Sequence, residues 1–239
     1  MRGVVTAGMI LVMQRVRVKI EGLQNPKDAL RTAQMGADAI GLVFAESPRW
    51  VSPEQARAIV DVLPPWVSTV GVFVNAAPDI INRVIERTRI THVQLHGDED
   101  PDILSKINAP CIKAFSVQDE SWLNEVLAWI DAATAKSNLT AVLLDAYSKD
   151  ARGGTGEIFN WDMVAGARAA GAMAGIDPII LAGGLNPQNV THAIDIVQPW
   201  AVDVASGVEK SPGVKDFKQI ARFLHATEEG RELRSEFWL

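Results

Sequence analysis

Two carboxylates in this sequence stand where acid–base chemistry would need them, at the ends of apolar runs. Glu21 follows the run Val16–Ile20 and precedes a glycine, while Asp145 ends the run Ala141–Asp145. When their surroundings separate their pKa values, one carboxylate can donate a proton while the other accepts one. The pair predicts proton transfer on a small substrate, with Glu21 and Asp145 as the catalytic residues.

The neighbours of Glu21 leave a second interpretation open. Period-2 alternation puts Arg17, Lys19 and Glu21 on one face of a strand and apolar residues on the other. Glu21 then either faces a pocket as a functional group, forms an internal salt bridge with Lys19 or Lys113, or lies solvated on a loop.

Two glycine-containing turns follow the last two apolar runs of the chain. Glycine lets the backbone approach an anion closely, and N–H groups at the start of a helix favour negative charge. We therefore expect these turns to bind a phosphate group, the alternative being tight turns without a ligand. The expected phosphate-binding residues are Gly183, Gly184, Leu185, Ser206 and Gly207.

Three further polar residues are candidates for substrate contacts. Arg49, in the loop Ser47-Pro48-Arg49, carries a guanidinium that suits a substrate carboxylate, or else is a surface charge. Asp203 points inward beside the second glycine turn, where it either accepts a hydrogen bond from a sugar hydroxyl or pairs with a buried lysine. His96 either lines the site or has a structural role.

A glycine-rich stretch, Arg152-Gly153-Gly154-Thr155-Gly156, follows Asp145. It is typical of a loop that closes over a ligand. It lacks the Gly-Lys-Ser/Thr ending of a nucleotide-binding P-loop, which argues against that class of site.

Short apolar runs must position all these residues. They are rich in Val, Ile, Leu and Ala, as parallel strands covered by helices are. The runs are Val16–Ile20, Ala39–Phe44, Thr69–Val74, His92–Leu95, Cys111–Phe115, Ala141–Asp145, Ile179–Ala182 and Ala201–Val204.

Segments of helical character separate the runs, and most begin near a proline, whose missing N–H costs least in a first helical turn. They are Asp28–Met35, Glu54–Val62, Asp79–Arg87, Asp102–Ile107, Glu120–Ile130, Trp161–Ala174, Gln188–Val197 and Val214–Leu224. This alternation predicts an α/β protein, a single (β/α)8 TIM barrel with a parallel eight-stranded sheet. An open doubly wound sheet is the alternative. The carboxyl ends of barrel strands form one face, which would bring the candidate residues together.

Composition limits the partners. The formal net charge of −6 argues against nucleic acid or an anionic membrane as a partner. The single cysteine, Cys111, excludes an intramolecular disulfide and a multi-cysteine metal site, and fits a reducing cytoplasm. We expect residues 1–14 to form a disordered extension, 15–226 the barrel and 227–239 a C-terminal tail.

Together, several motifs resemble those of phosphoribosylanthranilate isomerase of tryptophan biosynthesis, from about Arg17 to about Leu224. They are Val18-Lys19-Ile20-x-Gly22, Gly36-Ala37-Asp38-Ala39-Ile40-Gly41-Leu42-Val43-Phe44, Ser47-Pro48-Arg49, Gly71-Val72-Phe73-Val74-Asn75, Val93-Gln94-Leu95-His96-Gly97, Leu143-Leu144-Asp145, Gly153-Gly154-Thr155-Gly156 and Val202-Asp203-Val204-Ala205-Ser206-Gly207-Val208-Glu209.

This resemblance implies a cytoplasmic isomerase, monomeric or homodimeric, that needs no metal or organic cofactor and acts on a small phosphosugar. Its reaction is the Amadori rearrangement of N-(5-phosphoribosyl)anthranilate to 1-(2-carboxyphenylamino)-1-deoxyribulose 5-phosphate. It implies that Asp145 protonates the furanose ring oxygen and that Arg49 holds the anthranilate carboxylate. The glycine turns at Gly183 and Ser206 would hold the phosphate.

Glu21 departs from the family pattern, because it occupies the position of the cysteine that removes the C2 proton. A carboxylate can also remove a proton, and the related histidine-pathway sugar isomerase uses two aspartates for the same rearrangement. We therefore expect the family reaction with a substituted base. The alternatives are a phosphosugar isomerase repurposed for a related substrate, and a catalytically silent barrel that binds a phosphate ligand.

Overall fold

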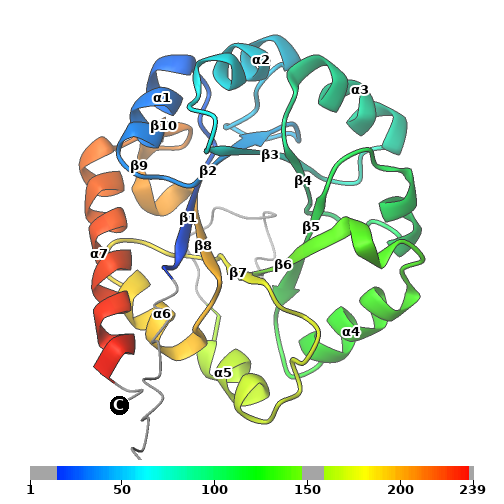
Figure 1. The fold of residues 1–239 in the computed structure, drawn as a ribbon, viewed down its shortest axis with the longest axis vertical. Coiled ribbons are helices and arrows are strands. Elements are labelled where there is room, and N and C mark those ends of the chain that lie inside the picture. The colour runs from blue at the N-terminus through cyan, green and yellow to red at the C-terminus, as the bar shows by residue number, and fades with distance from the viewer. Residues whose placement is uncertain (1–14, 147–158, 237–239) are drawn as a thin grey trace, which may run out of the picture.

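The computed structural model describes residues 15–146 and 159–236. In this part of the chain, eight parallel strands form a closed barrel in sequence order, and β8 pairs with β1 to complete it (Figure 1). Helices surround the barrel on its outside (Figure 1). The predicted (β/α)8 barrel is confirmed, and the open-sheet alternative is wrong.

The barrel strands have the bounds β1 (Arg17–Glu21), β2 (Ala39–Val43), β3 (Ser68–Phe73), β4 (His92–Leu95), β5 (Cys111–Val117), β6 (Leu139–Ala146), β7 (Ile179–Leu181) and β8 (Ala201–Val204). The α-helices are α1 (Pro26–Gln34), α2 (Pro53–Val62), α3 (Pro78–Thr88), α4 (Trp122–Ala132), α5 (Trp161–Ala169), α6 (Val190–Val197) and α7 (Phe217–Glu236). Short 3-10 helices are η1 (Pro101–Lys106), η2 (Lys136–Asn138) and η3 (Ser206–Val208), and β9 (Glu209–Ser211) pairs with β10 (Val214–Lys215) in a small hairpin.

Three predicted helices differ in the structure. The segment Trp161–Ala174 is helical only to Ala169, where α5 ends and turns follow. The segment Asp102–Ile107 falls largely in the 3-10 helix η1 (Pro101–Lys106), and Ile107 after it is extended. Six residues leave room for few of the i→i−4 hydrogen bonds of an α-helix, and 3-10 turns are common as connectors. The predicted helix Val214–Leu224 begins only at Phe217, because its first two residues form strand β10. Helix α7 then continues to Glu236, through most of the predicted tail.

The proline start signals are confirmed at the first three helices. In α2, the Ser52 side chain accepts a hydrogen bond from the Gln55 backbone N–H, and the Gln55 side chain accepts one from the Ser52 N–H. This capping box satisfies two donors that the helix leaves unpaired. The helix start is therefore set by local sequence.

Side chains along each strand alternate between the barrel interior and the helix layer. On β6, Leu143 belongs to a small cluster of buried apolar residues, whereas Leu144 belongs to the larger core that includes helix residues. On β1, the predicted alternation is confirmed: Val18 and Ile20 belong to the larger core, and Lys19 hydrogen-bonds to residues of other strands inside the barrel. The barrel interior therefore combines an apolar layer with a charged one.

Cys111 begins β5 and is fully buried. Burial raises the pKa of its thiol to about 12, so the group is protonated at neutral pH. Cys111 therefore lies in the core, at the end of the strand opposite to the candidate site.

A glycine on β2 leaves the space that the Glu21 side chain occupies. Gly41 pairs with Glu21 in the sheet register. A Cβ added at Gly41 would lie 2.8 Å from Glu21 Cγ and 3.0 Å from Glu21 Cα. Strand β2 therefore has no room for a side chain beside Glu21.

We expect Gly41→Ala to lower the free energy of unfolding by about 1–3 kcal/mol, because its methyl group overpacks the barrel against Glu21. Gly166→Ala is the matched control, because a Cβ at this position in α5 meets no atom within 4 Å. It should raise stability by about 0.5–1 kcal/mol, since glycine is costly inside a helix. Urea denaturation measures both, and equal effects would contradict this account of Gly41.

Candidate active site

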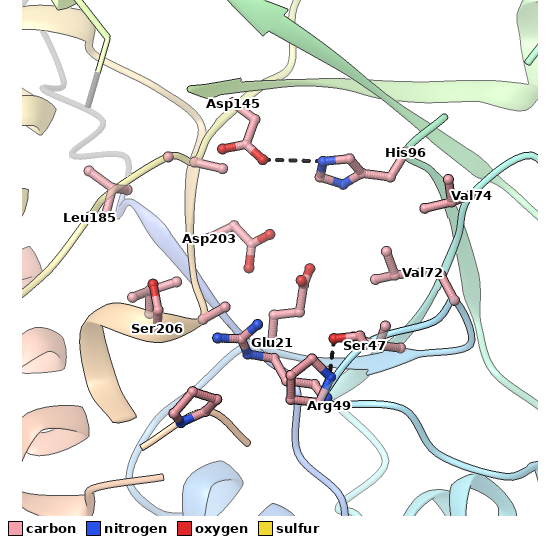
Figure 2. Close-up of a pocket in the computed structure, with 18 of the residues that line it drawn as sticks. Glu21, Ser47, Arg49, Val72, Val74, His96, Asp145, Leu185, Asp203 and Ser206 are labelled. Carbon is pink, nitrogen blue, oxygen red and sulfur yellow. Dashed lines mark hydrogen bonds and ion pairs between the residues drawn. The ribbon is translucent and has the colours of Figure 1, made fainter. Parts of the chain in front are cut away.

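A cavity of about 1180 Å³ opens at the carboxyl ends of the barrel strands (Figure 2). Nine of the ten predicted site residues line it: Glu21, Arg49, His96, Asp145, Gly183, Gly184, Leu185, Asp203 and Ser206. The structure therefore brings together residues from six strand ends and their loops. Gly207, the tenth, is not among the lining residues.

Glu21 is the last residue of β1, and its carboxylate points into the centre of the pocket (Figure 2). Lys19, two residues earlier on the same face, donates a hydrogen bond from Nζ to Glu21 Oε2 at 2.7 Å. The predicted salt bridge with Lys19 is thus present, while Lys113 pairs with Glu99 instead. Glu21 has both proposed properties at once, because it is paired and it faces the cavity.

The Lys19 ammonium hydrogen-bonds to three side chains inside the barrel. Besides Glu21, it donates to Asp203 Oδ2 at 2.6 Å and to Gln94 Oε1 at 2.8 Å. These three bonds use all three donors of the ammonium. The alternative predicted for Asp203, pairing with a buried lysine, is therefore present, and Gln94 is a site-forming residue that the sequence reasoning missed.

Two carboxylates share this one cation, and their pKa values move in opposite directions. Burial acts to raise the pKa of Glu21, but the charges of Lys19, His96 and Lys215, together with the hydrogen bond from Lys19, lower that pKa to about 2. For Asp203, burial dominates, and with the negative charge of Glu21 it raises the pKa to about 7 despite Lys19. Among the described residues, Asp203 Oδ1 is buried and has no hydrogen-bond partner, which explains why Asp203 is the costlier one to ionise.

Asp145 lies across the pocket from Glu21 and pairs with His96 (Figure 2). His96 Nε2 lies 3.1 Å from Asp145 Oδ2, and the Ala146 backbone N–H donates to Asp145 Oδ1 at 2.8 Å. On the other side of the ring, Gln94 Nε2 lies 2.9 Å from His96 Nδ1. A continuous series of hydrogen bonds therefore joins Glu21 to Asp145 through the barrel.

The direction of these bonds defines the protonation of His96. Lys19 can only donate, so the Gln94 carbonyl faces it and the Gln94 amide N–H points at His96 Nδ1. Nδ1 must then accept, which leaves the proton on Nε2, where it is donated to Asp145. Burial opposes a second proton, although the hydrogen bond and charge of Asp145 raise the pKa of His96. In its neutral form the ring is therefore the Nε2–H tautomer, because a proton on Nδ1 would face the amide N–H.

Arg49 is held by a carboxylate of the chain itself. Its Nε and Nη2 donate to the two oxygens of Glu209, each at 2.8 Å. The side chain packs over Gly22, where a Cβ would lie 2.6 Å from Arg49 Cδ. Only 11% of the side chain is exposed, so Arg49 is a pocket residue and not a surface charge.

The two predicted phosphate turns meet at the pocket edge. Gly183 and Gly184 have φ angles of +83° and +63°, which glycine adopts without strain. A Cβ at Gly183 would lie 2.3 Å from the Ala146 nitrogen, and one at Gly207 would lie 1.9 Å from the Leu185 carbonyl oxygen. Gly207 therefore contributes close packing of the two turns.

Within the described residues, no group of three or more histidine, cysteine or acidic side chains forms a candidate metal centre. None of the helices described is both long and apolar enough to cross a bilayer. The predicted closing loop, Arg152–Gly156, lies outside the described residues.

Known proteins resemble the chain over most of its length. A family model described as N-(5'phosphoribosyl)anthranilate (PRA) isomerase matches residues 18–226. The N-(5'-phosphoribosyl)anthranilate isomerase of Geobacter sulfurreducens is 48% identical over 210 residues, which cover 87% of this chain and 97% of that protein.

Solved structures agree in fold. The crystal structure of phosphoribosyl anthranilate isomerase from Thermotoga maritima has a TM-score of 0.79 and 40% identity, covering 90% of this chain and 99% of that one. A phosphoribosyl anthranilate isomerase in complex with reduced 1-(o-carboxyphenylamino)-1-deoxyribulose 5-phosphate has a TM-score of 0.76 and 39% identity, over 90% and 99% of the two chains. The match includes every strand end that lines the pocket, and the chain belongs to the N-(5'-phosphoribosyl)anthranilate isomerase family.

Proposed function

We propose that this protein isomerises N-(5'-phosphoribosyl)anthranilate to 1-(2-carboxyphenylamino)-1-deoxyribulose 5-phosphate, a step of tryptophan biosynthesis. The observation that carries this proposal is the placement of Glu21 and Asp145 on opposite sides of one pocket that the glycine turns and Arg49 also line (Figure 2). A substrate with a phosphate at one end and a carboxylate at the other would place its sugar between the two acids. We infer a cytoplasmic enzyme, monomeric or homodimeric.

Two groups of lining residues would bind the charged parts of the substrate. Backbone N–H groups of the turns at Gly183–Leu185 and Ser206 would bind the phosphate. Arg49 would bind the anthranilate carboxylate. Asp203 Oδ1, buried and without a partner among the described residues, would accept a hydrogen bond from a ribose hydroxyl.

Asp145 acts as the general acid that opens the sugar. Its proton passes to the furanose ring oxygen as the bond from that oxygen to C1 breaks, which leaves a Schiff base between C1 and the anthranilate nitrogen. His96 Nε2–H then stabilises the Asp145 carboxylate that remains. The neutral tautomer of His96 is the one that presents a proton to Asp145.

Glu21 acts as the general base that completes the rearrangement. It removes the C2 proton, the electron pair forms a C1–C2 double bond, and the Schiff-base nitrogen recovers its lone pair. The enol becomes the ketone when its hydroxyl loses a proton and C1 gains one. A pKa of about 2 keeps Glu21 ionised at neutral pH, at the expense of basicity. Proximity to C2 therefore has to supply most of its effect.

The first prediction concerns these two carboxylates. Loss of substrate fluorescence should follow addition of the purified protein, with kcat reduced by about 10²–10⁴-fold in Asp145→Asn and in Glu21→Gln, since each loses a positioned proton-transfer group. An inert wild type whose Glu21→Cys variant turns over would overturn the role of Glu21. It would support the silent-barrel alternative.

The second prediction concerns the shared cation. In Glu21→Gln, the pKa of Asp203 should fall from about 7 toward its usual value near 3.9, because the like charge is gone and Lys19 has one carboxylate to pair with. Carbon-13 NMR of the aspartate carboxyl groups measures this titration. An unchanged pKa would mean that Glu21 does not compete for Lys19.

The raised pKa of Asp203 also makes the free energy of unfolding depend on pH. The raised pKa of Asp203 means that the folded protein holds a proton that the unfolded chain releases near pH 4, so wild type loses this contribution as the pH rises through about 7. Glu21→Gln should show a smaller loss of unfolding free energy between pH 4 and pH 8.

The third prediction tests the tautomer. A carboxylate at position 94 accepts from Lys19 and also from His96 Nδ1–H, so Gln94→Glu should raise the pKa of His96 and make the ring cationic at neutral pH. The cationic ring would then form an ion pair with Asp145 and change the group that transfers the proton, which should reduce kcat by about 10²-fold. Nitrogen-15 NMR of the imidazole and the pH dependence of kcat check this, and a neutral ring in the variant would refute the assignment.

A further inference from the structure

A buried carboxylate outside the predicted site contacts both Arg49 and a lysine that reaches the phosphate turn. Glu209 begins β9, directly after η3, and its side chain is 4% exposed. It accepts hydrogen bonds from Arg49 at Oε1 and Oε2 and from Lys215 Nζ at Oε1, all at 2.8 Å. Arg49 and Lys215 are 11% and 2% exposed at their side chains. Three charged groups thus form a buried cluster beside the cavity.

The bonds to Glu209 select one edge of the Arg49 guanidinium. A guanidinium has five N–H donors. Glu209 takes the edge formed by Nε and Nη2, and no described residue of the protein is hydrogen-bonded to Nη1. The end edge, formed by Nη1 and the second Nη2 proton, has the two parallel donors that bind a carboxylate in bidentate fashion. Glu209 therefore determines how Arg49 presents itself to a ligand.

Lys215 supplies the positive charge that the Arg49–Glu209 pair lacks for binding an anion. Arg49 and Glu209 alone are neutral together and attract an anion weakly. With Lys215 the cluster carries a net charge of +1, and burial weakens its screening by solvent. The cluster can therefore hold a carboxylate by charge as well as by geometry.

Lys215 also connects this cluster to the phosphate turn. Its Nζ donates to the Ala205 carbonyl oxygen at 2.9 Å, one residue before Ser206. The hairpin of β9 and β10 lies against the Arg49 loop, since a Cβ on Gly213 would be 2.8 Å from the Pro48 carbonyl oxygen. The turn that would hold the phosphate and the loop that would hold the carboxylate are therefore braced by one hairpin.

We propose that Glu209 is a positioning residue that aims the end edge of Arg49 at the substrate carboxylate, and that Lys215 sets the spacing between this clamp and the phosphate turn. The pair makes the enzyme selective for ligands with a carboxylate and a phosphate at one separation. This inference rests on the proposed function, because it assigns the anthranilate carboxylate to Arg49.

The test compares Glu209→Gln with Glu54→Gln, a matched control at an exposed glutamate paired with Arg87. In Glu209→Gln, the KM for phosphoribosylanthranilate should rise by about tenfold or more, with a smaller change in kcat, since the clamp binds the substrate away from the reacting atoms. Inhibition by inorganic phosphate should change by less than about twofold, because the phosphate turn keeps Lys215. Lys215→Met should weaken both, and Glu54→Gln neither.

A double-mutant cycle decides whether Glu209 acts through Arg49. In an Arg49→Ala background, Glu209→Gln should have no further effect on KM. The same loss in both backgrounds, or an equal loss of phosphate inhibition, would overturn the inference. Glu209→Asp keeps the charge and should recover part of the affinity, and it replaces Glu209→Gln if thermal unfolding shows that the latter does not fold.

Equilibrium binding separates this inference from the proposed function. Calorimetric titration with reduced 1-(o-carboxyphenylamino)-1-deoxyribulose 5-phosphate needs no turnover. If wild type is inert but binds this compound, and Glu209→Gln weakens binding only when Arg49 is present, the inference holds and the proposed reaction fails. If wild type turns over substrate and Glu209→Gln leaves KM and binding unchanged, the inference alone fails.

Discussion

The arrangement of the site depends on one ammonium group inside the barrel. Lys19 contacts Glu21, Asp203 and Gln94 at once, and these partners come from three different strands. An unpaired charge in this position would be very costly, so all three contacts stabilise one another. The same group lowers the basicity of Glu21 and orients Gln94. The electrostatics on both sides of the pocket therefore originate from a residue that does not line it.

The charged layer of the barrel interior gives the proposed general acid and the proposed general base different surroundings. Glu21 and Asp145 need different surroundings, and the structure provides them through different neighbours. Glu21 has the Lys19 cation beside it, whereas Asp145 has the His96 imidazole and a backbone N–H. The two carboxyl groups therefore have different neighbours on the two sides of the pocket.

Much of this arrangement could be predicted from the sequence, because strand alternation and strand-end position are local properties. Strand alternation predicted that Lys19 and Glu21 lie on one face. The predicted carboxyl ends of the strands identified nine of the ten candidate residues as neighbours in the pocket. Applied to Gln94 and His96, two residues apart, the same alternation would have placed Gln94 inside the barrel. Nothing local indicates that Glu209 reaches Arg49, since 160 residues separate them. The tautomer of His96 depends on three partners in turn and emerges only in three dimensions.

The close contact between Glu21 and Gly41 has a consequence for exchanging residues between related barrels. Position 21 admits a side chain because the adjacent strand carries none there. The two positions therefore behave as a single unit of substitution. A larger residue on the second strand would meet the Cα and Cβ of Glu21 as well as its Cγ, so a change of rotamer at position 21 would not relieve the contact. Substitutions at positions 21 and 41 in related proteins should therefore be compared together.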